Sequence, residues 1–409
     1  MYLFPDDRLV STVVSMSALG KMITDLRENR GWSQGRLAAA LCDLSGRDTV
    51  NREHVSRWEH GRRRPGRYWL GYLATALAVP LTTLELADAG EVPDPRTAVA
   101  LRTAHEWLIA EPPQLTETRS GRRIGAAQAG QIYQRVAELR HLDDHLPCHD
   151  LEPLAIREYD AIATILTGCS YSENTGRSLL TSLAEAAQIC GWIESDAAHH
   201  AQAETRYLDG VRAGQDAGDR AVAANLLSCL AYQWTNLGKA RDAGLLAATA
   251  LHGAGADAAP VVRALLGERL AYARAHAGDR DGAARALDQV DDDYEARSPG
   301  DHEPEWTYWL DRDEITVMAA RCWTRLGQPA QAAPLIADVL TRYGQDQTRE
   351  QALYWSFLAQ AYLNAGQRAE AAQALATASS YAERTSSARV DEKITLLRRA
   401  LTGSGTPAP

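Results

Sequence analysis

Apolar residues recur at helical spacing in five short segments near the start of the chain. In the first segment, Leu19, Ile23 and Leu26 fall on one face of a helix, and a glycine then follows as a terminator. Ser33 and Asn51 precede two further segments and are residue types that commonly cap helices. The pattern predicts five helices, over 19–31, 34–42, 52–60, 68–79 and 80–86.

Residues 96–402 are helical in pattern almost throughout, and four segments of this region resemble one another. Each has a glycine eight residues after an apolar residue and an alanine five residues after that glycine, and a weaker copy surrounds 183–191. A tight turn between antiparallel helices favours glycine, and closely packed helices need small residues beside it. The spacing therefore predicts stacked helix pairs and an all-α fold. The glycines, at intervals of 40, 49 and 39 residues, are Gly238, Gly278, Gly327 and Gly366, and the alanines are Ala243, Ala283, Ala332 and Ala371.

Charge is distributed unevenly along the 409 residues. The net charge is −10, yet residues 1–90 carry +2 and the remainder carries −12. Seven arginines fall within 47–67, where the local charge is +4. A compact basic patch on an acidic protein indicates one surface that binds a polyanion such as nucleic acid.

Several features indicate a soluble protein of the cytoplasm. Apolar residues make up 45% and charged residues 23%, which excludes wholesale disorder. Residues 1–8 have neither the basic start nor the apolar run of a signal peptide. The uncharged stretches 68–84 and 221–238 are interrupted by proline, threonine or amide residues, so no membrane span is predicted. The six cysteines lie far apart, as is usual for reduced thiols.

Two motifs before residue 70 closely resemble the Cro/phage-repressor (XRE) type of helix-turn-helix domain. They read S-Q-x-x-L-A, from Ser33, and V-N-R-E-H-V-S-R-W-E-H-G-R-R-R-P, from Val50. The resemblance covers residues 19–87 and implies that 52–60 is a recognition helix that enters the major groove of DNA. The turn before that helix, 43–49, is about seven residues longer than is usual in the family.

The resemblance also assigns roles to residues around the recognition helix. Arg27 and Glu59 match a family pair that forms a salt bridge between the first helix and the recognition helix, so both are expected to be structural. Arginine at a base edge can pair with guanine through two hydrogen bonds, whereas phosphate contacts set affinity and salt dependence. The residues expected at base edges are Arg52, Glu53, His54 and Arg57, and those expected at the DNA backbone are Ser33, Gln34, Arg62, Arg63, Arg64 and Arg67.

The repeated segments resemble the tetratricopeptide repeat (TPR), a pair of antiparallel helices about 34 residues long. Trp234, Trp323 and Tyr362 match its aromatic position. The longer intervals imply longer helices or loops than in a strict unit, with an acidic insertion at 291–304. The resemblance spans about residues 170–400 and implies a concave surface for peptides, small molecules or partner helices.

In layout, the two resemblances together are similar to the peptide-pheromone-responsive regulators. That layout implies a ligand-controlled DNA binder that forms a homodimer on a palindromic double-stranded operator. No cofactor is expected, and the effector could be a small molecule or a peptide. An alternative is a protein-interaction scaffold whose repeats dock a partner such as a kinase, sigma factor or toxin. The expected domains are a helix-turn-helix domain (18–88), a helical connector (96–168), a TPR-like repeat domain for effector binding and dimerisation (169–402) and a disordered tail (403–409).

Aromatic and amide residues on the predicted repeat helices are candidates for effector binding. The aromatic residues could form a cage for a cationic or planar ligand, or could instead fill the core between repeats. The amides could clamp the backbone of an extended peptide, although most surface amides have no such role. The candidates are Trp306, Tyr308, Trp309, Tyr354 and Trp355 among the aromatic residues, and Asn225, Gln233, Asn236, Gln360 and Asn364 among the amides.

A histidine-rich segment raises the question of a metal site. His141 and His145 are four residues apart, on one face of a helix, and Cys148 and His149 follow. The spacing matches no strong zinc signature, so no metal is predicted and a solvated helix end is the favoured interpretation. A metal-dependent enzyme around this segment is a third alternative. The sequence has no phosphate-binding, dinucleotide-binding, zinc-protease or nucleophile-elbow motif, so no enzyme is predicted.

Overall fold

The chain, examined as a computed structural model, forms two compact units, Met1–Val99 and Ala100–Pro409. The residues that the structure describes are 17–77, 79, 81–88, 95–109, 121–144, 146, 148–344, 347–384 and 387–403. The predicted tail therefore lies outside the described residues except for Gly403. No described helix has the length and apolar character that crossing a bilayer requires.

The first unit contains the five predicted helices. Their apolar faces meet in one core, in which Ile23, Leu37, Leu41, Val55 and Leu73 are fully buried. The prediction of a five-helix, helix-turn-helix layout is confirmed. The helices are α1 (Ala18–Asn29), α2 (Gln34–Ser45), α3 (Arg52–Glu59), α4 (Arg67–Ala76) and α5 (Leu81–Asp88).

Polar side chains fix where α2 and α3 begin. The Ser33 hydroxyl accepts a hydrogen bond from the first turn of α2 at 3.1 Å, and the Asn51 side chain accepts two from the first turn of α3 at 3.0 and 3.1 Å. These bonds satisfy N–H groups that have no partner within a helix. At its other end, α2 runs past the predicted end at residue 42 because the left-handed residue that stops it is Gly46, with φ of 63°. The turn before α3 is therefore shorter than the sequence indicated.

The second unit is helical almost throughout, as the repeat pattern predicts. A short 3₁₀ helix, η1, follows directly after the acidic insertion. The elements are α6 (Pro95–Ile109), which begins before the division between the units, α7 (Ala126–Asp143), α8 (Cys148–Gly168), α9 (Glu173–Asp196), α10 (His200–Ala217), α11 (Arg220–Asn236), α12 (Ala240–Ala254), α13 (Pro260–His276), α14 (Arg280–Glu295), η1 (Glu305–Thr307), α15 (Arg312–Arg325), α16 (Pro329–Leu340), α17 (Thr348–Asn364), α18 (Arg368–Ala382) and α19 (Ala388–Thr402).

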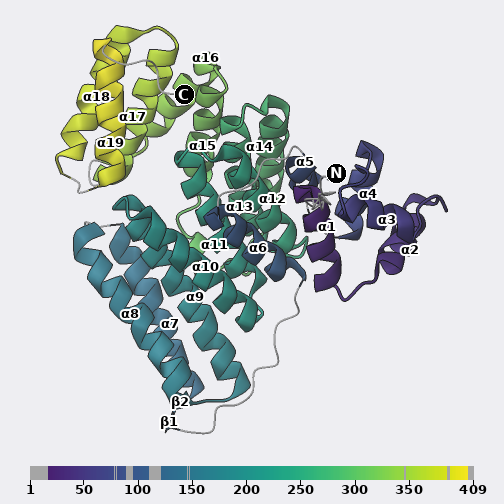
Figure 1. Ribbon diagram of the computed structural model, residues 1–409. Coiled ribbons are helices and arrows are strands. Elements are labelled where there is room, and N and C mark those ends of the chain that lie inside the picture. The colour runs from purple at the N-terminus through teal and green to yellow at the C-terminus, as the bar shows by residue number, and fades with distance from the viewer. Residues whose placement is uncertain are drawn as a thin grey trace, which may run out of the picture. The chain divides into compact units, whose positions relative to one another are not determined.

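Successive helices of this unit form antiparallel pairs, from α9 with α10 to α17 with α18 (Figure 1). The four predicted glycines lie between the helices of four pairs, and their φ angles of 72–80° fall in the left-handed region. The four predicted alanines are all fully buried where the helices of a pair approach each other. The prediction of a TPR-like array is confirmed.

The turn of the first pair departs from the glycine pattern. Ala198 lies between α9 and α10, forty residues before Gly238, and its φ is 63°. Among the described residues it is the only one besides glycines with a positive φ. Ala203, five residues later, is fully buried, so this pair keeps the repeat register. A left-handed conformation costs a residue with a Cβ atom about 1–2 kcal/mol.

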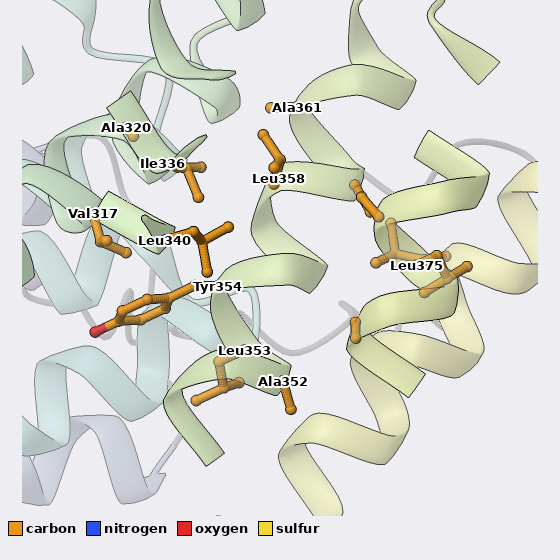
Figure 2. Packing of buried hydrophobic residues seen from close by; sticks show 14 of the residues in the cluster. Val317, Ala320, Ile336, Leu340, Ala352, Leu353, Tyr354, Leu358, Ala361 and Leu375 are labelled. Carbon is orange, nitrogen blue, oxygen red and sulfur yellow. The ribbon is translucent and has the colours of Figure 1, made fainter. Parts of the chain in front are cut away.

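Apolar side chains of α15 to α18 pack together in the last part of the array (Figure 2). Ile336 and Leu340 of α16 point towards α17, where Leu358 and the small Ala361 meet them. Tyr354 belongs to the same cluster and is 4% exposed. Full burial of one such aliphatic side chain stabilises the fold by about 1.5–3 kcal/mol, so this cluster, which α19 also joins, holds the last two helix pairs and α19 together.

The connector contains a short parallel strand pairing, β1 (Arg122–Arg123) with β2 (Cys169–Ser170), that the sequence did not indicate. It joins the segment before α7 to the end of α8. Two-residue strands are too short to show an alternating pattern, so periodicity cannot reveal them. The connector, predicted to be helical only, therefore also contains this strand pair.

Candidate DNA interface and effector cavity

Helix α3 presents its basic residues to solvent. Val55 and Trp58 anchor one face in the core, whereas Arg52, Glu53 and Arg57 are exposed on the other. Such a helix has one face for packing and one for a partner. The predicted backbone contacts that follow the helix are exposed as well, namely Arg62, Arg63, Arg64 and Arg67.

Three of the predicted base contacts have partners within α3 or its cap. Arg57 forms an exposed ion pair with Glu53 at 2.7 Å. Exposed pairs of this kind contribute about 0–1 kcal/mol, so DNA could displace it at little cost. His54 is half-buried, and its Nδ1 lies 2.9 Å from the side-chain oxygen of Asn51. His54 therefore helps to cap the helix as well as facing the proposed interface.

A buried ion pair joins α1 to the end of α3. Arg27 Nε lies 2.6 Å from Glu59 Oε1, and the two side chains are 9% and 2% exposed. The hydrogen bond to Glu59 raises the pKa of Arg27 above its ordinary value. Gln34 Nε2 donates to Glu59 Oε2 at 2.7 Å, so this amide is directed into the protein. The start of α2 therefore offers its backbone N–H groups and Ser33, rather than the Gln34 amide, to a phosphate.

A surface hollow lies between the starts of α2 and α3. Helix N-termini carry a partial positive charge and unsatisfied N–H groups, which favour anions. Here two N-termini and an arginine side chain border the same hollow, which suits a phosphate of the DNA backbone. The hollow is lined by Gln34, Asn51, Arg52, Glu53 and Ser56.

The second unit contains a cavity of about 200 Å³. Its wall comes from the first helix of successive pairs, α9, α11, α13, α15 and α17, together with residues of α7, of α19 and of the segment around η1. The wall contains aromatic, apolar and charged side chains. Five of the ten effector candidates line it, namely Asn225, Trp306, Tyr308, Trp309 and Tyr354.

The other five effector candidates lie outside the cavity wall. Trp355 packs against the core of α15 to α18, and Gln233 is buried with its amide bonded to the backbone of α10. Asn236 accepts a hydrogen bond from a tyrosine of α13, while Gln360 and Asn364 bond to each other. These residues therefore serve local packing and are not brought into one site.

Charged residues of the wall were not singled out by the sequence analysis. Repeat spacing nevertheless contains a signal for one of them, because Trp192, Tyr232, Tyr272 and Arg321 follow one another at intervals of 40, 40 and 49 residues. Trp192 stacks on Tyr232 with ring centroids 5.9 Å apart, and the two tyrosine rings are 5.5 Å apart. The Arg321 guanidinium lies 4.4 Å from the Tyr272 ring centroid. The four side chains at this repeat position therefore form a continuous stack beside the cavity.

Burial shifts the ionisation of two carboxyl groups in the wall. It raises the pKa of Glu268 to about 7, although the neighbouring Arg269 opposes the shift. Burial also raises the pKa of Glu314 to about 7, despite hydrogen bonds that its carboxylate accepts from two tyrosines. Both groups therefore change charge near neutral pH.

Ion pairs between distant helices close the wall. Arg349 of α17 lies 3.2 Å from Asp143 of α7, and Arg389 of α19 lies 3.1 Å from Asp196 of α9. Arg140 of α7 pairs with one carboxylate of α9 and with another at η1. Helices from the early part of the unit, α7 and α9, therefore meet the last helices, α17 and α19, around the cavity.

The histidine-rich segment assembles no metal site within the described part of the chain. The Nε2 atom of His141 lies 3.0 Å from Glu305, and that of His149 lies 3.5 Å from Asp150. His145 lies outside the described residues. Among those described, no three or more His, Cys, Asp or Glu side chains gather in a way that could hold a metal ion.

Comparisons with known proteins bear on the first unit most directly. Residues 18–87 match the family model described as a helix-turn-helix domain. A search of curated proteins gives no match. Among solved structures, the chain is similar to PlcR of Bacillus thuringiensis, crystallised in complex with the peptide PapR7 and DNA. The identity is 11%, the match covers 94% of this chain and 99% of that chain, and the TM-score is 0.24. The first unit therefore contains a helix-turn-helix domain.

Proposed function

We propose that this protein is an XRE-type transcription regulator of the cytoplasm, which binds a specific DNA operator through α3 and responds to an effector held in the cavity. The observation that carries the proposal is the exposed basic face of α3 within a helix-turn-helix domain. Arg52 and Arg57 would read base edges, with about 1–3 kcal/mol of discrimination for each well-made contact. The arginines after α3 would bind phosphates.

We further propose that the protein acts as a homodimer on a palindromic operator. One recognition helix buries little DNA surface, and regulators of this class pair two half-sites about one helical turn apart. The repeat domain supplies the larger surface for dimerisation. Native mass spectrometry of the purified protein tests this point, since a monomer bound to single half-sites would contradict it.

The cavity would connect the effector with the operator. An effector that favours one separation of the two recognition helices shifts the balance between two states of the dimer. A coupling free energy of about 1–3 kcal/mol changes operator affinity about 5–150-fold.

Operator selection from random DNA, followed by binding measurements on three variants, tests the function. Arg52→Ala is expected to weaken operator binding about 5–150-fold while changing binding to random DNA little. Arg63→Ala should weaken both and lower the salt slope by about 1, because it removes a phosphate contact. Lys21→Ala, an exposed basic residue of α1, is the matched control and should change neither. Failure to enrich any operator would overturn the proposed function.

A further inference from the structure

The size of the cavity limits what the effector can be. Pockets for drug-sized ligands commonly measure about 300–1,000 Å³. The cavity of this protein, at about 200 Å³, is smaller, a size that suits a metabolite better than an extended chain. The inference below rests on the proposed function, since it names the chemistry of the effector that the cavity takes.

Glu268 is a buried carboxyl group that accepts no hydrogen bond in the part of the chain that the structure describes. Its side chain lines the cavity from α13, and the residue is 1% exposed. Neither carboxylate oxygen has a hydrogen-bond partner among the described residues. The nearest cation is the adjacent Arg269, whose guanidinium nitrogen lies 3.5 Å away without a hydrogen bond. A buried carboxylate without a hydrogen bond is costly, so a hydrogen-bond donor from a ligand would stabilise it. The cavity beside it leaves room for such a donor.

Arg321 is the complementary case on α15. Its guanidinium donates hydrogen bonds to the hydroxyl oxygens of Tyr232 and Tyr272, at 3.0 and 2.8 Å, and lies 4.4 Å from the ring centroid of Phe357. Within the described part of the chain, Arg321 forms no ion pair with a carboxylate. The three aromatic groups hold the guanidinium plane in place but leave its charge unneutralised.

Other arginines of the wall provide the contrast. Arg140, Arg349 and Arg389 each pair with a carboxylate of the protein, at 2.7, 3.2 and 3.1 Å. The charges of these three arginines are therefore neutralised by ion pairs that join helices of the wall. Arg269 also lines the wall and lies 3.5 Å from Glu268, but no hydrogen bond joins them. Arg321 and Glu268 therefore line one cavity with their hydrogen-bonding capacity towards an opposite charge unused.

Apolar side chains complete the wall beside these two groups. Ile189, Val317, Met318 and Leu353 line the same cavity, from α9, α15 and α17. A ligand that fits must therefore offer a cationic donor, an anionic acceptor and an apolar portion within a small volume. A free amino acid with an apolar side chain is the simplest molecule that has all three.

We propose that the cavity binds a metabolite-sized zwitterion, an apolar amino acid or a close analogue, with its ammonium group at Glu268 and its carboxylate at Arg321. The ammonium group would donate to a carboxylate that accepts no hydrogen bond in the chain itself, and the ligand carboxylate would meet an arginine that has no carboxylate partner among the described residues. The apolar portion replaces water against the aliphatic residues of the wall.

Thermal-shift and calorimetric titrations with the standard amino acids, at millimolar concentration, test this proposal. At least one apolar amino acid is expected to raise the melting temperature. Its decarboxylated amine and its deaminated acid should each bind about 10- to 100-fold more weakly, since each loses one charge-assisted hydrogen bond. Absence of a shift with every amino acid, or equal binding of the zwitterion and its two analogues, would overturn the proposal.

Variants of the two residues assign the contacts. In Glu268→Gln, the zwitterion should no longer bind more tightly than the deaminated acid. In Arg321→Gln, the zwitterion should no longer bind more tightly than the decarboxylated amine. Arg321→Lys keeps the charge and should retain part of the affinity, which separates loss of contact from loss of fold. Arg285→Gln on α14, an exposed arginine outside the wall, should leave the titrations unchanged.

Operator binding measured on the same preparations separates this inference from the proposed function. A protein that selects an operator yet binds no zwitterion retains the function and loses the inference. A protein that binds a zwitterion but selects no operator loses the regulator function, while the ligand chemistry stands.

Discussion

Glu268, like Glu314, is a carboxyl group whose burial makes the stability of the second unit depend on pH. Burial raises its pKa from an ordinary value of about 4.5 to about 7. A group with a raised pKa in the folded state stabilises the fold fully below its unfolded pKa, and that contribution is lost as the pH rises through the folded pKa. The loss therefore falls between about pH 4.5 and a little above pH 7.

Replacing the Glu268 carboxyl group with an amide should remove the part of the pH-dependent loss that Glu268 causes, while the part due to Glu314 remains. At about pH 8, Glu268→Gln is expected to be more stable than the natural protein by up to about 3 kcal/mol, because it carries no charge to bury. At about pH 4.5 the difference should nearly vanish. Urea unfolding of the second unit at both pH values measures it. Glu370→Gln, an exposed carboxyl on α18, is the control, and a difference independent of pH would contradict the assignment.

At the scale of elements, the turns between paired helices show how the repeat tolerates variation. Four turns use glycine in the left-handed region, and the turn from α9 to α10 uses Ala198 in the same conformation. The weaker copy that the sequence indicated at 183–191 lies inside α9, so its register was wrong. The turn of the first pair comes at Ala198 instead, where no glycine marks it. The turn keeps its place in the 40-residue repeat although alanine replaces the usual glycine.

Ala198→Gly is accordingly expected to stabilise the second unit by about 1 kcal/mol, since glycine adopts a positive φ without the Cβ clash. Gly366→Ala is the reciprocal variant. A Cβ atom there would meet no other group within 4 Å, so its cost is that of the backbone alone, and the unit should lose a similar amount. Denaturant unfolding measures both changes. Stability changes of the same sign in the two variants would contradict this account.

Helix existence could be predicted from the sequence, whereas the members of the cavity wall could only partly be predicted. Apolar spacing and the glycine–alanine pattern indicate helix pairs because both reflect local packing. Cavity membership depends on which face of each helix turns inward, and Gln233 shows the difficulty, since its amide bonds to α10 instead. Arg321 stands at a repeat position that aromatic residues occupy in the preceding pairs. Its place in the cavity wall therefore became visible only in the folded structure, where these side chains lie next to one another.

At the scale of the whole molecule, each unit has its own buried core. Arg27→Ala should therefore act on the first unit alone. It leaves Glu59 buried without its cation, which costs about 3–5 kcal/mol. Differential scanning calorimetry should show the transition of the first unit at a lower temperature and that of the second unit unchanged.

Glu28→Ala is the matched control for this variant. Glu28 also contacts Arg27, at 3.1 Å, but its side chain is 62% exposed, so its removal should change the transition little. A joint shift of both transitions in Arg27→Ala would show that the units unfold together and would contradict the prediction.

Closure of the cavity by Asp143 with Arg349, and by Asp196 with Arg389, has a consequence for the order of synthesis. A ribosome completes the helix-turn-helix domain about 300 residues before it reaches α19. Under the proposed function, a nascent or truncated product that lacks the last helix would bind the operator but have no finished pocket. Such fragments would occupy operators without responding to the effector. Correct regulation would therefore require that incomplete chains be degraded quickly.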